Sequence, residues 1–144
     1  CSDLFIALGE SQIMVLASCA NNRVTARSMS IIIKDKKLYF QTDKSFLKYQ
    51  QIKENENIAL CINNIQIEGI CKEKGHPMDG ANKAFIEQYK KYYQGSFDSY
   101  SHLQTETVFE VAPVLITTWN YEEGIPFREY YDFKHRTYVK AYYQ

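Results

Sequence analysis

Residues 24–51 read VTARSMSIIIKDKKLYFQTDKSFLKYQQ, and this stretch decides how the rest of the chain is interpreted. Side chains from Val24 to Ile33 alternate between two faces, which is the two-residue period of a β-strand. Asp35-Lys36-Lys37 is a charged turn, and Leu38–Gln41 returns as the second strand of a hairpin. The stretch therefore predicts a strand, a tight turn and an antiparallel partner.

The end of the same stretch predicts a helix N-terminus with positive charge around it. Thr42–Ser45 supplies candidate N-cap side chains, and we expect a short helix over Phe46–Glu54. Free backbone N–H groups and the helix dipole favour an anion at such a position. Lys44 and Lys48 add charge, and Arg27 on the adjacent strand has a planar fork suited to phosphate. An ordinary capped helix with solvated lysines is the alternative.

Apolar runs on both sides of this stretch predict further antiparallel strands. We expect strands over residues 12–20, 24–34, 58–62, 65–73 and 107–119, with Asn-Asn turns at 21–22 and 63–64. The run 12–20 is continuously apolar, which is typical of a strand covered on both faces. Six strands with short connections fit a closed barrel better than an open sheet, because closure removes exposed edges. The predicted fold is mainly β, a six-stranded antiparallel barrel with a few flanking helices, in one domain over residues 1–144.

The remaining segments are expected to flank the barrel. Asp3–Gly9 is predicted as a short helix that ends at Gly9. Ala81–Gln94 carries four aromatic side chains at helical spacing, which predicts an amphipathic helix. Gly95–Gln104 is polar, and we expect it to be irregular or loosely helical. Arg128–Gln144 is rich in tyrosine and has no clear period, so the sequence assigns it no structure.

Composition excludes some classes of function. Lys+Arg and Asp+Glu both number 17, and a net charge of zero argues against a sequence-independent nucleic-acid binder. One local excess, six lysines against three acidic residues over 34–54, suits a single phosphate better than a polyanion. The four cysteines are far apart, the three histidines have no ligand spacing, and no long apolar span occurs. We expect a reduced, cytoplasmic protein without metal, membrane or nucleic-acid partners.

One ordered set of residues spans the predicted hairpin and helix: Arg27-Ser28-Met29, Tyr39-Phe40-Gln41-Thr42, Ser45, Lys48 and Gln51-Ile52. This set resembles the flavin-nucleotide-binding split barrels of the pyridoxamine 5′-phosphate oxidase superfamily. The likeness covers residues 13–119 and is strongest over 27–66. It implies a six-stranded antiparallel split β-barrel that binds FMN at the interface of a homodimer.

The resemblance also implies roles for individual residues. Arg27 and Lys48 would hold the FMN phosphate, with Thr42 and Ser45 supporting them. Ser28 would also bind the cofactor, and Met29 would place its backbone along the isoalloxazine edge, where amide groups meet the ring.

Three positions complete the implied site. Gln41 stands where the family has an aromatic residue, and Leu47 stands where it has a second basic residue, for which Lys44 is a candidate replacement. Gln66 and Trp119 match residues that reach the flavin from the neighbouring subunit.

Beyond Trp119 the sequence departs from the family pattern. The true pyridoxamine phosphate oxidases continue with Gly-Gly and a closely spaced Arg-x-His that grips the substrate. This chain has Asn120-Tyr121-Glu122-Glu123-Gly124, and Arg128 is displaced with no His two residues later. Synthesis of pyridoxal phosphate is therefore not expected, and a related branch fits better.

The resulting hypothesis is an FMN-dependent oxidoreductase that exchanges hydride or electrons between a donor such as a reduced nicotinamide and a small acceptor. No catalytic residue is assigned. The first alternative is a non-catalytic flavin carrier or sensor on the same fold. A nucleic-acid-binding barrel and a haem or deazaflavin protein are the others.

Overall fold

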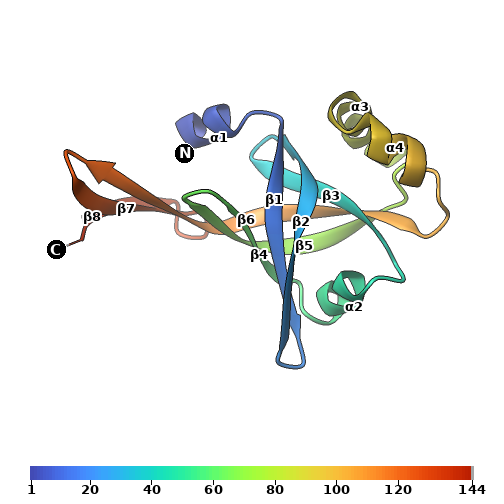
Figure 1. Ribbon diagram of the computed structural model, residues 1–144, viewed down its shortest axis with the longest axis horizontal. Coiled ribbons are helices and arrows are strands. Elements are labelled where there is room, and N and C mark those ends of the chain that lie inside the picture. The colour runs from blue at the N-terminus through green and yellow to red at the C-terminus, as the bar shows by residue number, and fades with distance from the viewer. Residues whose placement is uncertain (144) are drawn as a thin grey trace.

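The computed structural model describes residues 1–143, so Gln144, the last residue of the predicted domain and tail, lies outside the described residues. The strands are β1 Ser11–Ala20, β2 Arg23–Lys34, β3 Lys37–Asp43, β4 Asn57–Ile62, β5 Ile65–Gly75, β6 Glu106–Glu122, β7 Ile125–Asp132 and β8 Thr137–Tyr142 (Figure 1). The helices are α1 Ser2–Leu8, α2 Leu47–Glu54, α3 Lys83–Tyr92 and α4 Gln94–Tyr100, with a 3-10 turn at Gly80–Asn82 before α3.

Six strands close into an antiparallel barrel, as the sequence predicts. The order is β3-β2-β1-β4-β5-β6, and a ladder between β3 and β6 joins the two ends. The tight hairpin turns follow from residues that accept the left-handed conformation. Asn21 and Asn22 have φ of 52° and 62°, and Asp35 and Lys36 have φ of 51° and 61°.

Aromatic and aliphatic side chains fill the barrel. Phe40 on β3 and Phe109 on β6 are direct cross-strand neighbours, both fully buried, and their ring centroids lie 5.5 Å apart. Full burial of one such side chain contributes about 1.5–3 kcal/mol. A second cluster outside the barrel packs α3 and α4 against β2 and β6 through Phe85, Tyr89 and Phe97.

The barrel is split along one seam. β2 and β3 pair only at one end, where Ile32–Lys34 meets Lys37–Tyr39. Farther along, β2 stays with β1 while the rest of β3 turns to β6. Residues 28–30 of β2 and 41–43 of β3 therefore border an opening instead of a ladder, and this opening places the candidate site.

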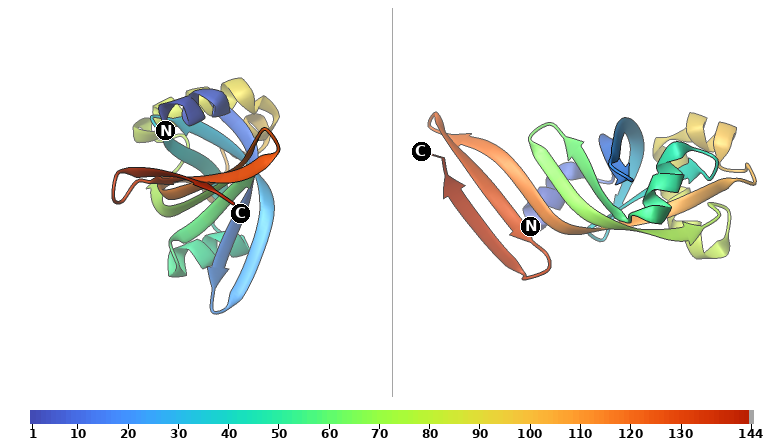
Figure 2. Two further views of the ribbon diagram at one scale, coloured as in Figure 1. Left: turned by 90° about the vertical axis from the view of Figure 1, so that its left-hand side faces the viewer. Right: turned by 90° about the horizontal axis from the view of Figure 1, so that it is seen from below.

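The C-terminal residues form a projecting arm, defined here as residues 119–142. β6 runs past the barrel and pairs with β7, which pairs with β8, and Figures 1 and 2 show this hairpin leaving the barrel body. The sequence assigned no structure to this tail. All six residues of β8 are exposed, so the hydrophobic alternation that marks a strand in a barrel wall is missing.

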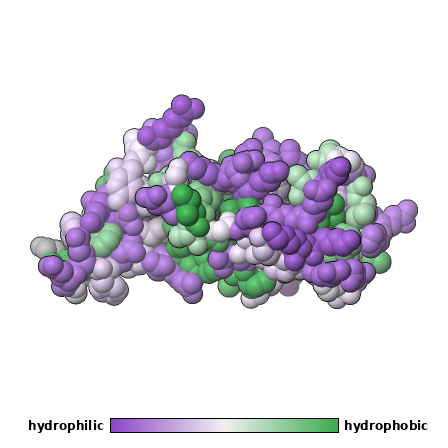
Figure 3. Space-filling model, turned by 90° about the horizontal axis from the view of Figure 1, so that it is seen from above, coloured by the Kyte–Doolittle hydropathy of each residue, from purple (hydrophilic) through white to green (hydrophobic). Residues whose placement is uncertain are grey.

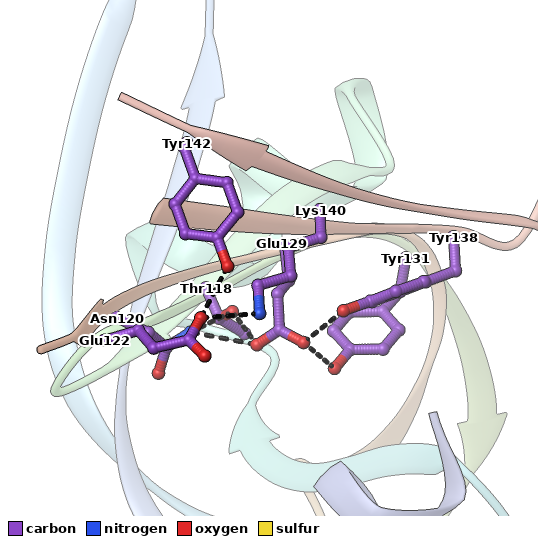
Figure 4. A network of polar contacts seen from close by, with 8 residues as sticks. All are labelled: Thr118, Asn120, Glu122, Glu129, Tyr131, Tyr138, Lys140 and Tyr142. Atoms are coloured by element: carbon purple, nitrogen blue, oxygen red, sulfur yellow. Dashed lines mark hydrogen bonds and ion pairs between the residues drawn. The ribbon is translucent and has the colours of Figure 1, made fainter. Parts of the chain in front are cut away.

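A carboxylate holds the arm together. The Glu129 side chain accepts hydrogen bonds from Thr118, Asn120, Tyr131 and Tyr138 over 2.6–3.1 Å (Figure 4). Next to it, Glu122 accepts bonds from Lys140 at 3.0 Å and Tyr142 at 2.5 Å. These contacts join all three strands of the arm, which has few buried apolar side chains.

Two expectations about local structure were wrong. β1 is not covered on both faces, because Ile13 and Val15 point outward and are 54% and 41% exposed. The apolar run around Cys61 favours a buried thiol, but Cys61 is exposed, because it is the direct neighbour of Val15 on that outward face. Of the two structures expected for the polar segment 95–104, the helical one is present: residues 94–100 form α4, and Phe97 packs into the α3 cluster.

The surface of the molecule is mostly hydrophilic in the view of Figure 3, with separate hydrophobic patches between charged side chains. Within residues 1–143, no helix has the length and apolar character needed to cross a membrane.

Candidate functional site

A cavity of about 400 Å³ lies in the split between β2 and β3 and extends under α3 and α4. Five of the predicted cofactor residues line it, namely Ser28, Met29, Gln41, Thr42 and Lys48. The remaining lining residues are Ser30, Asp43, Phe46, Tyr89, Ser96, Tyr100, Leu103 and Glu106. The structure thus brings residues from the hairpin and the following helix together in one cavity.

Arg27 lies beside this cavity in a polar network. Its guanidinium donates to the Leu16 carbonyl at 3.2 Å, to the Ser18 hydroxyl at 3.0 Å and to the Thr25 hydroxyl. Burial lowers the pKa of Arg27. No carboxylate forms a salt bridge with Arg27 among residues 1–143, so its positive charge is oriented but not neutralised.

Gln51 of α2 holds this network in place. Its Oε1 accepts hydrogen bonds from the Ser18 hydroxyl at 2.7 Å and the Thr25 hydroxyl at 2.6 Å. Its Nε2 donates to the Arg23 carbonyl at 3.0 Å. Gln51 is 3% exposed, so α2 is anchored to the β1–β2 hairpin at the position that orients Arg27.

Lys48 supplies a second cation to the same region. Burial lowers the pKa of Lys48, the positive charge of Arg27 lowers it further, and Glu106 and Asp43 oppose the shift. Its Nζ lies 4.7 Å from the centroid of the Phe46 ring. Within the described residues Lys48 also has no salt bridge. Two cations that repel each other and form no salt bridge make a site that an anion would stabilise.

Thr42 contributes an unsatisfied polar atom to this wall. The residue is 3% exposed, and its hydroxyl has no hydrogen-bond partner among residues 1–143. A buried polar group without a partner costs free energy and is uncommon in folded proteins. Thr42 is therefore a position where a bound group would add a missing hydrogen bond.

The helix N-terminus differs from its prediction. The N-cap of α2 is Phe46, without a side-chain cap, because Asp43 folds into a local turn instead. Its Oδ1 accepts from the backbone N–H of Ser45 at 2.8 Å and from the Ser45 hydroxyl at 2.7 Å. Lys44 and Ser45 are exposed, and neither lines the cavity. The backbone N–H groups at the start of α2 are thus free of side-chain caps.

Gln66 and Trp119 are not brought to the cavity within one chain. Gln66 is exposed on β5, and Trp119 is 46% exposed at the base of the arm. The Arg128 guanidinium stacks 3.9 Å from the centroid of the Trp119 ring. Both residues lie on the outer surface, and neither lines the cavity.

Sequence reasoning missed one group in the cavity, Glu106. It is 6% exposed, and its Oε1 accepts a hydrogen bond from Gln41 Nε2 at 3.0 Å. Burial raises the pKa of Glu106, and the charge of Asp43 raises it further. Asp43 and Glu106 are paired across β3 and β6, which are far apart in the sequence. The signal was absent because that long-range ladder is not visible in the sequence.

The wall formed by α3 and α4 was also missed. Tyr89 lies against the cavity, and its hydroxyl is 2.7 Å from Ser96 Oγ. Ser101 donates to Gln41 Oε1 at 2.8 Å, which fixes the Gln41 carboxamide between β6 and α4. Among the described residues, no group of three or more His, Cys, Asp or Glu side chains is arranged to hold a metal ion.

Solved structures with similar folds bind several cofactors. An FMN-binding protein from Nostoc punctiforme PCC 73102, described as pyridoxamine 5′-phosphate oxidase-related, is 15% identical with a TM-score of 0.65, covering 92% of this chain and 87% of its own. The heme storage protein HutZ from Vibrio cholerae is 12% identical with a TM-score of 0.63, covering 70% and 80%. A FAD-binding protein from Mesorhizobium loti is 11% identical with a TM-score of 0.57, covering 73% and 83%. At these identities the likeness shows the fold alone.

A search of curated proteins gave no match. The sequence model of the family described as Pyridoxamine 5′-phosphate oxidase matches residues 5–120, which span the whole barrel up to the base of the arm. Because this match covers well over half of its residues, the chain belongs to the pyridoxamine 5′-phosphate oxidase family.

Proposed function

We propose that this protein is an FMN-dependent oxidoreductase that acts on a small molecule in the split of the barrel. One observation carries the proposal: Arg27 and Lys48, two cations without salt bridges, stand beside a cavity whose wall contains the unsatisfied Thr42 hydroxyl. The cavity of about 400 Å³ falls in the range of small-molecule sites.

The residues present fit the phosphate of FMN. Arg27 offers a guanidinium held by the Ser18 and Thr25 hydroxyls, which Gln51 fixes in turn, and Lys48 offers an ammonium. The uncapped start of α2 adds backbone N–H groups and the positive end of the helix dipole. A phosphate here would relieve the repulsion between Arg27 and Lys48, so the favourable charge is already in place before binding.

The split supplies polar backbone for a flavin ring. On the β3 side of β2 the ladder stops at Ile32, so residues 28–30 present backbone groups that no strand pairs. Such groups require hydrogen-bond partners when they are covered. We assign Met29 and its neighbours the role of holding the edge of the ring, and Gln41 the role of a fixed wall.

We propose a homodimer as the working form. An outward row of neighbouring residues crosses four strands, from Ser28 through Val15 and Cys61 to Gln66. Ser28 lines the cavity, whereas Val15 is an exposed aliphatic residue that a second copy would cover. Covering this row would place the partner's surface beside the cavity, and Gln66 and Trp119 would then contribute to the site of the other copy.

In this reaction the residues of the chain would bind FMN, orient it and exclude water from the cavity, and the bound flavin would supply the redox chemistry. Arg27, Lys48 and Thr42 would anchor the phosphate. β2 would hold the ring edge, and the α3–α4 wall would exclude water from one side of the cavity. The other proposed features are a small reactant or electron donor as the partner and the cytoplasm as the location.

The test is titration of FMN into the purified protein, followed by flavin absorbance and fluorescence. Arg27→Ala and Lys48→Ala should each weaken binding by about 1.5–3 kcal/mol, or roughly 10–150-fold, because each removes a charge-assisted contact. Lys44→Ala should change little, because Lys44 is exposed outside the cavity. Wild-type affinity in both cavity variants would refute the phosphate assignment.

A second measurement separates an enzyme from a carrier. The FMN-loaded protein is mixed with NADH or NADPH and a panel of small acceptors, and turnover is followed. Bound flavin with no turnover would favour a carrier or sensor. Preferential uptake of FAD, a deazaflavin or haem over FMN would instead replace the cofactor in this proposal.

A further inference from the structure

The cavity has positively charged groups on one side and carboxyl groups on the other. Lys48 lines the cavity on the α2 side, with Arg27 of β2 close enough to lower its pKa, whereas the β3–β6 side has the carboxyl groups of Asp43 and Glu106. If a phosphate neutralises the two cations, as the proposed function requires, the two carboxylates remain without a counter-charge in the cavity. An occupied site would therefore be negative on the side that faces α3 and α4.

The two carboxyl groups are not equivalent. Asp43 accepts hydrogen bonds from the Ser45 backbone, the Ser45 hydroxyl and the Thr105 hydroxyl at 2.7–2.8 Å, which leaves little capacity for a ligand. Glu106 accepts one, from Gln41 to Oε1. In the described residues nothing donates to Oε2, and this oxygen is not sealed from solvent. Of the two carboxyl groups, Glu106 thus has the acceptor that is open to a ligand.

The position of Glu106 is fixed. The side chain is 6% exposed, and the Gln41 carboxamide that contacts it is itself held by Ser101. Before a reactant binds, water can solvate this open oxygen, and a reactant that displaces the water must supply a donor or a cation in its place. Lys48 lies beyond salt-bridge distance, so it does not take that role.

We propose that Glu106 is the specificity-determining residue for the reactant of this site, and that it selects molecules with a positively charged nitrogen over molecules with a carboxylate or phosphate. This inference rests on the proposed function, since it takes the reactant to lie beside a bound flavin nucleotide. Tyr89 and Tyr100 on the helical wall would pack against the body of such a reactant, because both line the same cavity. The reactant class is thus a small, partly apolar amine.

The test uses three probes of similar size on the FMN-loaded protein at pH 7.5: benzylamine, benzyl alcohol and benzoate. Binding is read from the change in flavin absorbance. Benzylamine should bind at least about tenfold more tightly than benzoate, with benzyl alcohol between them. Glu106→Gln keeps the size and the acceptor for Gln41, and it should reduce the affinity for benzylamine about tenfold while leaving benzyl alcohol within about threefold.

Glu87→Gln is the matched control, because Glu87 is an exposed acid on α3 that does not line the cavity. It should leave all three affinities unchanged. Benzoate binding as tightly as benzylamine, or an unchanged benzylamine affinity in Glu106→Gln, would overturn the inference. A loss of FMN affinity in Glu106→Gln with the amine preference intact would assign Glu106 to the cofactor instead, which also overturns it.

The FMN titration without probes separates this inference from the proposed function. If the wild-type protein takes up no FMN, both fail together. If it takes up FMN and shows no preference for the amine, only the role of Glu106 fails.

Discussion

Thr42 and Thr107 are direct neighbours across the β3–β6 ladder, and both are buried, yet only one hydroxyl is satisfied. Thr107 donates to Glu73 Oε2 at 2.7 Å, whereas Thr42 has no partner in the described residues. The barrel therefore tolerates an unfavourable hydroxyl at the wall of the cavity and satisfies the adjacent one. This contrast favours a ligand-binding role for Thr42 and a structural role for Thr107.

Valine substitutions at Thr42 and Thr107 should change the free energy of unfolding in opposite directions. Thr42→Val should stabilise the apoprotein by about 1 kcal/mol, because it removes an unsatisfied hydroxyl, and should weaken FMN binding by a similar amount. Thr107→Val should instead lower the free energy of unfolding by about 1–3 kcal/mol, since Glu73 loses a donor. Urea denaturation and FMN titration measure both effects. Destabilisation by Thr42→Val with unchanged FMN affinity would contradict the assignment.

Gln51→Ala should weaken FMN binding, although Gln51 is not itself proposed to contact FMN. The Ser18 and Thr25 hydroxyls lose their acceptor, so the free energy of unfolding should fall by about 1–3 kcal/mol. FMN affinity should fall as well, because Arg27 loses the support of both hydroxyls. Gln50→Ala, an exposed neighbour, is the control and should change stability by less than about 0.5 kcal/mol. Equal behaviour of the two variants would refute the positioning role of Gln51.

FMN affinity should depend on pH through Lys48. Burial and the charge of Arg27 lower the pKa of Lys48 below its ordinary value of 10.5, so the ammonium loses its proton earlier on the alkaline side. The affinity should therefore decline as pH rises towards 10.5. Lys48→Arg should remove most of this decline, because the guanidinium stays charged. A decline of equal size in Lys48→Arg would assign the titration to another group.

Glu129→Gln should loosen the arm and leave the barrel intact. Burial favours the neutral acid, but the hydroxyls of Tyr138, Thr118 and Tyr131 outweigh it and lower the pKa of Glu129. The stabilisation is thus present above the ordinary value of 4.5 and is lost as pH falls through the lowered pKa. We expect a loss of about 1–2 kcal/mol near neutral pH, reduced by partial solvent screening.

Hydrogen exchange of the β7 and β8 amides is the measurement for this variant. Protection of the wild-type arm relative to the intrinsic exchange rate should fall as the pH drops through the lowered pKa of Glu129, and protection in the variant should be low at all pH values. Glu123→Gln in the exposed turn should match the wild type. Slow exchange in the Glu129→Gln arm would show that strand pairing alone holds it.

Val15→Asp should report on the proposed dimer. Val15 is 41% exposed on the outward row that adjoins the cavity, so a charge there is tolerable in a monomer and unfavourable in a covered interface. Sedimentation should show a shift from dimer to monomer, with FMN affinity reduced. Ile6→Asp, at a 76% exposed position on α1, should leave assembly unchanged. A monomeric wild type would refute the dimer proposal directly.

The barrel was predictable because its signals are local. Alternation in Val24–Ile33, the Asn-Asn turns and the apolar runs each act over a few residues, and all agree on antiparallel strands. Half of the predicted site residues line one cavity for the same reason, since Ser28, Met29, Gln41, Thr42 and Lys48 follow one another along a hairpin and a helix. The arm lacked such a signal, because Glu129 and its hydroxyl donors replace the apolar face that a pattern would reveal.

Glu106 and the α3–α4 wall were beyond prediction for a different reason. Glu106 enters the cavity through its pairing with Asp43, a contact between residues far apart in the sequence. Ser96 and Tyr100 enter because Phe97 folds a polar segment into a helix. Both depend on long-range packing, which residue order does not encode locally.

The seam between β2 and β3 has a mechanical consequence. Only three residue pairs fasten these strands, whereas β1 and β2 are fastened by ten. A molecule bound in the seam with hydrogen bonds to both strands would stabilise the fold. At a concentration a hundredfold above its dissociation constant, it would raise the free energy of unfolding by about 2.7 kcal/mol. Without this ligand, β2 and β3 should be the first strands to separate in local unfolding. Proteases should therefore cleave the empty barrel most readily at these two strands.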